Sequence, residues 1–152
     1  MDLDHIDINI LNILQEDGRI TNSKLSKMVN ISPPPTLERV KKLEKKGVIR
    51  KYAALVDPRA LGINNLVFAE VTLERHGSDA VEGFIREINT ISEVMECHHI
   101  TGDADFLLKI AIRDIAAYEQ LLLRKLTSIS GIRHLKTLVV LSTMKDKTAF
   151  TI

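Results

Sequence analysis

The densest run of basic side chains in this 152-residue chain lies between residues 38 and 51. Two of these positions, Glu38 and Glu44, are acidic, and seven are basic: Arg39, Lys41, Lys42, Lys45, Lys46, Arg50 and Lys51. Lys and Arg side chains pair with phosphate oxygens and release the counterions that a nucleic acid holds. The run therefore indicates either a polyanion-binding surface or, as the simpler alternative, the solvated face of a helix.

A helix is expected to begin at Ser32, because Pro33 lacks only an N–H that the first helical turn leaves unpaired. A helix fits the major groove of DNA, and its first residues reach the base edges. The candidates for reading bases are Pro34, Pro35, Thr36 and Arg39. Arg39 is favoured, since a guanidinium can bond two guanine acceptors at once. The candidates for holding phosphates are Lys41, Lys42, Lys45 and Lys46, with Lys24 and Lys27 on the preceding helix.

A second group with chemical potential is the run Thr101-Gly102-Asp103-Ala104-Asp105. Gly102 lets the backbone approach a ligand closely, and nearby N–H groups with the Thr101 hydroxyl could hold a carboxylate. Asp103 or Asp105 could pair an ammonium group through charge-assisted hydrogen bonds. The run could thus bind a zwitterion such as an amino acid. The simpler alternative is a hairpin turn, in which Gly and Asp serve turn geometry alone.

The consecutive residues Cys97, His98 and His99 resemble a metal site only in composition. Alternation along a strand puts His98 on one face and the other two on the opposite face, so the three cannot converge on one ion. A buried thiol and interface histidines are expected instead. No triad order, phosphate loop or metal-ligand spacing is present. We therefore predict no enzyme activity, no catalytic residues, no metal and no cofactor.

Composition limits the class of protein. Apolar residues make up 45% of the chain and charged residues 27%, which is typical of a folded domain. The net charge is only +1, so any basic surface must be local. Residues 1–56 carry 10 basic and 7 acidic side chains, and residues 57–152 carry 11 and 13. No apolar run is long enough for a membrane span, the acidic start lacks a secretory segment, and Cys97 is the only cysteine, so we expect a reduced, cytoplasmic protein.

The periodicity of the first part is helical. Asp4 is expected to cap a first helix that ends near Gly18, and Thr21 a second. The third helix is expected to bury Leu37, Val40 and Leu43 and to end at Gly47. Together these helices describe a helix-turn-helix unit. Residues 48–49 and 52–56 are expected to pair as a small hairpin, a wing that carries Arg50 and Lys51.

The second part alternates strands and helices. Strands are expected over residues 66–74, 94–101, 105–112 and 132–143. Ser78 is expected to cap a helix that buries Val81, Phe84, Ile85 and Ile88, and Asp114 one that buries Ile115, Tyr118, Leu121 and Leu122. The order βαββαβ is that of a ferredoxin-like sandwich. The predicted class is α+β, with a winged helix-turn-helix domain over 1–56, a linker over 57–65 and a ferredoxin-like domain over 66–152.

Several stretches, in order along the chain, resemble the Lrp/AsnC (feast/famine) family of transcription regulators. They are DINILN (7–12), DGRITN (17–22), LERVKKLE (37–44), GVI (47–49), ECH (96–98), TGDADFLLK (101–109) and TLVV (137–140). Two departures stand out. Ala104 occupies a position where many members have an aromatic residue, and the triple proline before Thr36 differs from the usual run at the start of the helix.

The resemblance implies a sequence-specific DNA-binding regulator of amino-acid metabolism. It also implies dimers through the β-sheets that assemble into octamers or similar discs, and an amino-acid effector bound at the loop from Thr101 to Asp105. Leucine, methionine or another apolar amino acid is the expected effector. The expected location is bacterial or archaeal cytoplasm, on the nucleoid, with no membrane partner.

Two alternatives remain open on the sequence. One is a family-related haem-pathway (siroheme) decarboxylase, and the other is an amino-acid-sensing module that does not bind DNA. The basic third helix argues against the enzyme, which would not need it. A gel shift on the protein's own upstream DNA separates the regulator from the sensing module.

Overall fold

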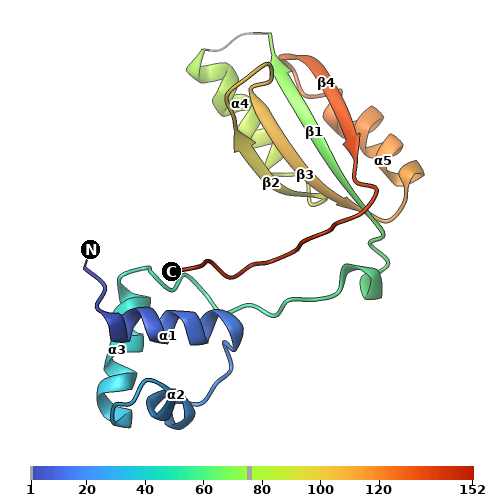
Figure 1. Cartoon of the computed structure of the whole chain (residues 1–152). Helices are drawn as coiled ribbons and strands as arrows, with labels where there is room; N and C mark the ends of the chain where they lie inside the picture. The colour runs from blue at the N-terminus through green and yellow to red at the C-terminus, as the bar shows by residue number, and fades with distance from the viewer. Residues whose placement is uncertain (1, 75–76) are drawn as a thin grey trace. The chain divides into compact units, whose positions relative to one another are not determined.

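The computed structural model describes residues 2–74 and 77–152 (Figure 1). Two compact units are present: Met1–Leu55 with Met144–Ile152, and Val56–Thr143. The sequence predicts that residues 144–152 belong to the second domain, whereas here they lie with the helices of the first. Within the described ranges, no helix is long and apolar enough to cross a membrane.

The first unit contains the three expected helices, α1 (His5–Glu16), α2 (Asn22–Met28) and α3 (Pro33–Lys45). Asp4 caps α1 by accepting a hydrogen bond from the Asp7 N–H at 2.9 Å, and Thr21 caps α2. Asn30 adopts a left-handed conformation in the turn between α2 and α3 (φ 57°). The core of the unit is formed by Ile10, Leu11, Leu25, Val29 and Leu43.

The third helix is rotated about its axis relative to the sequence-based expectation. Thr36 is fully buried, and Leu37, expected inside, is 42% exposed. Thr36, Val40 and Leu43 are spaced i, i+4, i+7 and therefore share the inner face. The Thr36 hydroxyl donates to the Ser32 carbonyl at 2.9 Å, so burying it leaves no unsatisfied polar atom.

The expected hairpin after α3 is absent. Residues 48–56 lie in the described part of the chain and carry no strand. Gly47 ends the helical turn with φ 72°, and the Tyr52 hydroxyl donates to Glu44 at 2.9 Å. That bond ties the extended segment to α3 in place of strand pairing. Arg50 and Lys51 lie exposed on it.

The second unit is the expected βαββαβ sandwich. Its strands are β1 (Asn65–Leu73), β2 (Val94–His99), β3 (Phe106–Ile112) and β4 (Ile132–Val139), antiparallel in the order β2-β3-β1-β4. Helices α4 (Ser78–Ile88) and α5 (Ile115–Leu121) cover one face of the sheet (Figure 1). A π-helical turn, η2 (Leu122–Leu126), continues α5, and a 3₁₀ turn, η1 (Pro58–Leu61), lies within the expected linker.

Alternation along the strands builds the core of this unit. On β1 and β3 every second residue is buried under the helices, from Val67 to Leu73 and from Phe106 to Ile112. Three expectations need correction. Gly77 rather than Ser78 is the N-cap of α4. Ile85 and Ile115, expected inside, are exposed, because Phe84, Ile88, Tyr118 and Leu121 already fill the helix–sheet interface. The last strand ends at Val139 rather than at residue 143.

Candidate nucleic-acid interface and ligand loop

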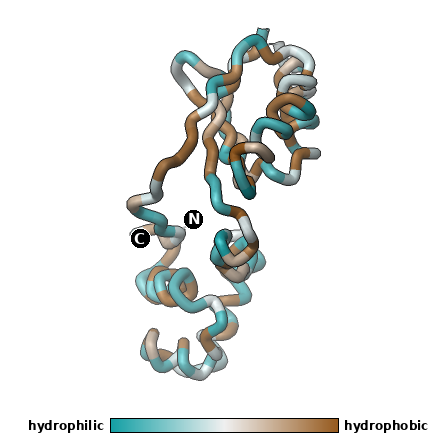
Figure 2. Tube along the Cα trace, turned by 90° about the vertical axis from the view of Figure 1, so that its right-hand side faces the viewer, coloured by the Kyte–Doolittle hydropathy of each residue, from teal (hydrophilic) through white to brown (hydrophobic). Residues whose placement is uncertain are grey.

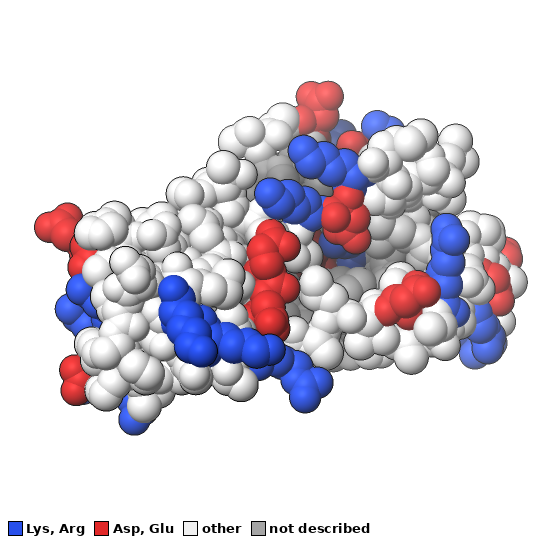
Figure 3. Space-filling view, turned by 60° about the horizontal axis from the view of Figure 1, so that its bottom comes forward, with Lys and Arg blue, Asp and Glu red and all other residues white. Residues whose placement is uncertain are grey.

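The outer face of α3 is exposed and predominantly basic. Pro34 and Pro35 lie exposed in its first turn. Lys41, Lys42 and Lys45 are exposed farther along, and α2 contributes Lys24. Figure 3, which brings the lower part of Figure 1 forward, shows Lys and Arg side chains gathered in a row near the lower left of the face in view. The first unit therefore presents several positive charges to solvent, and these charges remain hydrated in the folded protein.

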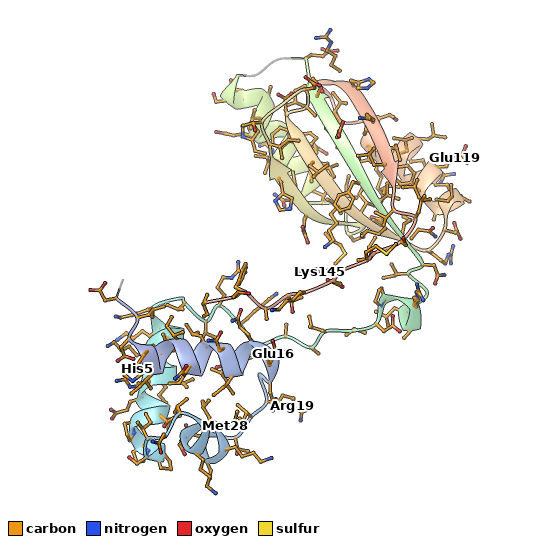
Figure 4. All side chains as sticks on the ribbon, in the orientation of Figure 1. His5, Glu16, Arg19, Met28, Glu119 and Lys145 are labelled. Atoms are coloured by element: carbon orange, nitrogen blue, oxygen red, sulfur yellow. The ribbon has the colours of Figure 1, made fainter. Side chains whose placement is uncertain are left out.

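The neighbouring elements hold α3 by polar contacts. The Asn22 amide at the start of α2 donates to the Pro33 carbonyl at 2.8 Å, which fixes the first turn of α3 against α2. Arg19 projects from the turn that follows α1, and Met28 projects from the end of α2 (Figure 4). The Met28 side chain is 62% exposed, so it adds an apolar group to the surface beside Lys24 and Lys27.

Arg39, the favoured base-reading residue, is engaged within the unit. Its Nη1 lies 2.7 Å from the carboxylates of both Asp4 and Asp7, and its side chain is 31% exposed. The pKa of Asp4 is lowered by the N–H of Asp7 and then by Arg39, and the same ion pairs raise the pKa of Arg39. Arg39 thus joins α3 to the first turn of α1.

Two of the four expected base-reading side chains do not project freely from α3. Thr36 cannot reach a base, because its side chain is in the core, and this part of the expectation is corrected. Arg39 is held by two carboxylates. Sequence reasoning missed Leu37 and Glu38, which are exposed in the first half of α3. With Thr36 placed on the buried face of α3, the helical periodicity puts Leu37 and Glu38 on the exposed face.

The ligand loop from Thr101 to Asp105 is fastened to β1 at one end. Asp105 Oδ2 accepts a hydrogen bond from the Leu73 N–H at 2.7 Å, and the Asp105 N–H donates to the Val71 carbonyl at 2.9 Å. Asp105 is thus a structural latch that holds the loop to the end of β1. This carboxylate already serves the fold, which the sequence hypothesis of an ammonium partner did not foresee.

The rest of the loop is largely open to solvent. Thr101, Gly102 and Asp103 are exposed, and Gly102 has φ 122°, a conformation that side chains rarely adopt. Ala104 is buried. The Asp103 carbonyl accepts from the Thr72 hydroxyl at 3.4 Å, a bond in which the Asp103 carboxylate takes no part. The loop can therefore offer a hydroxyl, backbone groups around a glycine and one exposed carboxylate to a zwitterion.

Strand β2 separates its titratable residues as alternation predicts. His98 Nε2 and Lys109 Nζ lie 2.9 and 2.8 Å from the Glu96 carboxylate, and the pKa of Glu96 is lowered chiefly by Lys109. His99 stacks on Phe106 with ring centroids 4.9 Å apart. Cys97, expected to be buried, is exposed at this edge, although neighbouring atoms desolvate its thiol enough to raise its pKa. No group of three or more metal-ligating side chains occurs among the described residues.

Within the sheet unit, no described element covers the sheet face opposite the helices, and this face is partly apolar. Phe68 lies at its centre, with Lys109 and Leu138 as its register partners on β3 and β4. Lys136 pairs with Glu70 at 3.2 Å on the same face. An apolar sheet face rimmed by ion pairs is typical of a protein–protein interface.

Family models match both units. A model described as the Lrp/AsnC ligand-binding domain matches residues 66–150. A model of a winged helix-turn-helix DNA-binding domain matches residues 3–50. The chain is 46% identical over 145 residues to the leucine-responsive regulatory protein of Escherichia coli K12, and the match covers 95% of this chain and 88% of that protein. The leucine-responsive regulatory protein of Salmonella typhimurium matches to the same extent.

Solved structures agree with the fold. A transcriptional regulator of Neisseria meningitidis, in complex with L-methionine, superposes with a TM-score of 0.94 at 37% identity, over 99% of this chain and 97% of that one. AsnC of E. coli gives 0.90 at 27% identity, over 97% and 98%. A feast or famine regulatory protein of Mycobacterium tuberculosis, complexed with L-methionine, gives 0.85 at 28% identity, over 95% and 96%.

Proposed function

The chain belongs to the Lrp/AsnC family of DNA-binding transcription regulators, which pair a helix-turn-helix with an amino-acid-binding domain, and on this premise we propose which of its surfaces perform the two tasks. It is a regulator and not an enzyme. The comparisons give no support to a decarboxylase or to a sensing module without DNA binding. As a DNA-binding regulator, it is expected to act in the cytoplasm, on the nucleoid.

DNA binds to the outer face of α3. Lys41, Lys42, Lys45 and Lys24 hold phosphates, which positions the unit on the duplex without specifying sequence. The single observation that carries this assignment is the exposure of Lys41, Lys42 and Lys45 on the face of α3 opposite the buried Thr36 and Leu43. Genome-wide mapping of bound DNA, with and without added methionine or leucine, tests the function in the cell.

Base reading falls to the exposed residues in the first half of α3. Pro34 and Pro35 shape the entry, and Leu37 suits the methyl group of thymine. Glu38 would be repelled by phosphates, whereas a carboxylate at a base edge accepts a hydrogen bond from the cytosine amino group. Arg39 acts as a positioning residue, because its guanidinium ties α3 to α1.

The effector is an apolar amino acid held by the loop from Thr101 to Asp105. Methionine and leucine are the leading candidates, since two structural relatives carry L-methionine and the sequence relatives are named as leucine-responsive. The Thr101 hydroxyl and backbone groups at Gly102 hold the carboxylate, and Asp103 pairs the ammonium. Asp105 keeps the loop in place, and the small, buried Ala104 adds no ring to the site.

Asp103→Asn is expected to abolish stabilisation by the effector, because it removes the charge that pairs the ammonium. In the unaltered protein, an amino acid at 100 times its Kd stabilises by about 2.7 kcal/mol. Thermal-shift measurements with each of the twenty amino acids provide the readout. The matched variant Asp105→Asn should lower the stability without ligand, since Leu73 N–H loses a charged acceptor. A full thermal shift in Asp103→Asn would remove this carboxylate from the site.

Two copies of the chain pair through the uncovered sheet face, and dimers assemble further into octamers or similar discs. Support comes from Phe68 and Leu138 on that face and from exposed apolar residues on the extended segments, such as Leu55 and Leu141. Figure 2 shows hydrophobic stretches in brown along the segments that leave the sheet. A dimer also meets the need of a small DNA-binding module for two half-sites about one helical turn apart.

Phe68→Glu is expected to convert the assembly to monomers, because a carboxylate would be buried at the centre of the sheet–sheet contact. Light scattering coupled to size-exclusion chromatography measures the mass. Leu123→Glu is the matched control, since Leu123 is exposed on η2 and away from this face. If Phe68→Glu leaves the assembly mass unaltered, another surface must hold the subunits together.

A further inference from the structure

The C-terminal end of the chain lies on the first helix. The Phe150 N–H donates to Gln15 Oε1 at 2.7 Å, and Gln15 Nε2 donates to the Phe150 carbonyl at 3.2 Å. Asn12 Nδ2 donates to the Ile152 carbonyl at 3.4 Å. In Figure 1 the terminal segment, in dark red, runs toward α1. Residues from opposite ends of the sequence thus share these hydrogen bonds.

The contact with Gln15 satisfies both backbone groups of one residue. A side-chain amide that donates to a carbonyl and accepts from the N–H of the same residue bonds it as a neighbouring strand would. Asn12 and Gln15 are three residues apart and therefore adjacent on the surface of α1, where both are half-buried. Two amides at this spacing can hold an extended segment with little dependence on its side chains.

The tail borders an apolar groove within the same unit. The groove has a volume of about 950 Å³, and its lining includes Leu11, Leu14, Tyr52, Leu55, Phe150 and Ile152. Phe150 remains 75% exposed, so the backbone bonds rather than its ring hold the tail at the rim. Tyr52, another lining residue, is fixed by its bond to Glu44.

We propose that residues 148–152 form a strap that closes the DNA-binding unit by binding α1 of the same chain through Gln15 and Asn12. The chain then connects the helical unit to the sheet unit twice, once between Leu55 and Val56 and once between Thr143 and Met144. A second connection restricts how freely the helical unit can reorient. A restrained unit loses less rotational and translational entropy when it binds DNA. The strap is a regulatory element outside both the α3 surface and the ligand loop.

The strap is tested directly by hydrogen exchange at the Phe150 amide in the whole 152-residue chain. Gln15→Leu keeps a good helix former of similar size and removes the amide. Loss of two hydrogen bonds is expected to speed exchange of the Phe150 N–H roughly tenfold. Glu16→Gln, at the next and exposed position, is the matched control and should leave that rate unaltered. Equal exchange in all three proteins would overturn the proposal.

A cross-linking experiment separates a strap on the same chain from one exchanged between copies. With Cys97→Ser as background, Glu16→Cys and Phe150→Cys are combined, so that Gln15 and Asn12 keep their bonds to the tail, and the protein is treated with a short bis-maleimide. A cross-linked species of monomer mass on a denaturing gel is expected. A covalent dimer would overturn the assignment to the same chain, and absence of any cross-link would overturn the contact itself. Neither measurement involves DNA, so its failure is distinct from failure of the proposed function.

The effect on DNA rests on the proposed function. Deletion of residues 148–152 is expected to weaken binding to a duplex with optimally spaced half-sites by roughly tenfold and to flatten the dependence of affinity on half-site spacing. Gel shifts on duplexes with the half-sites moved apart in steps of one base pair measure this. An unaltered spacing profile would show that the strap does not restrain the unit.

Discussion

Replacing Lys41 and Lys45 by Glu is expected to lower affinity for duplex DNA about 100- to 1,000-fold at moderate salt. The reason is that two phosphates are no longer neutralised and two repulsive charges are added on the outer face of α3. The slope of log K against log salt should become shallower by about 1.8, or about 0.9 for each phosphate that is no longer neutralised. Fluorescence anisotropy with a labelled upstream duplex, repeated over a range of salt concentrations, measures both quantities.

The matched control reverses two exposed bases of the second unit, Arg86 and Arg124. This protein has the same net charge as the α3 variant, so a general electrostatic effect would weaken both equally. We expect the control to retain most of its affinity. Equal losses in the two proteins would mean that α3 has no special part in binding.

Arg39→Met is expected to destabilise the helical unit by about 1–3 kcal/mol. Without the guanidinium, the Asp7 carboxylate, in a residue that is only 8% exposed, loses its ion-pair partner. The destabilisation is smaller than for a fully buried ion pair, because the Arg39 side chain is 31% exposed and solvent screens its charge. Urea unfolding at neutral pH provides the measurement, and adding Asp7→Asn to Arg39→Met should restore part of the stability.

The same variant decides between the two roles of Arg39. A positioning residue does not touch a base, so the folded Arg39→Met protein should keep its discrimination among base pairs and should differ mainly in stability. A base-reading arginine would give the opposite result, with a loss of about 1–3 kcal/mol in discrimination at one base pair and little change in unfolding.

The loss of folding stability at low pH also depends on the Asp4–Arg39 ion pair. In the folded protein the pKa of Asp4 lies below its usual value of 3.8, first because the Asp7 N–H caps it and then because of Arg39. Stability from this group is therefore present above pH 3.8 and is lost as the pH falls below that value. Arg39→Met should remove only part of this fall, since the backbone bond remains.

Local signals in the sequence predicted much of the fold. Asp4 and Thr21 cap the helices where expected, and the alternating strands indicated the βαββαβ order. The phase of α3 was not predictable in this way, because hydrophobicity alone puts Leu37 inside. The fold instead buries Thr36, whose hydroxyl finds a carbonyl one turn earlier.

The candidate sites were predicted as segments, and the roles of individual residues depended on tertiary contacts. Arg39 and Asp4 are 35 residues apart, and Asp105 meets the Leu73 N–H across 32 residues. No local pattern reports such pairs. The prediction of a hairpin over residues 48–56 was wrong for a similar reason. The strand propensity of residues 52–56 does not form a stable strand without further strands to pair with.

The most direct test of the central claim, that the outer face of α3 binds a specific duplex, is a competition measurement with the unaltered protein. Its affinity for its own upstream duplex is compared with that for a shuffled duplex of the same composition, from low to physiological salt. We predict a preference of at least about 1,000-fold for the genuine sequence near physiological salt, with steep salt dependence for both duplexes. Equal affinity for the two duplexes near physiological salt, or no binding to either in dilute buffer, would contradict the account.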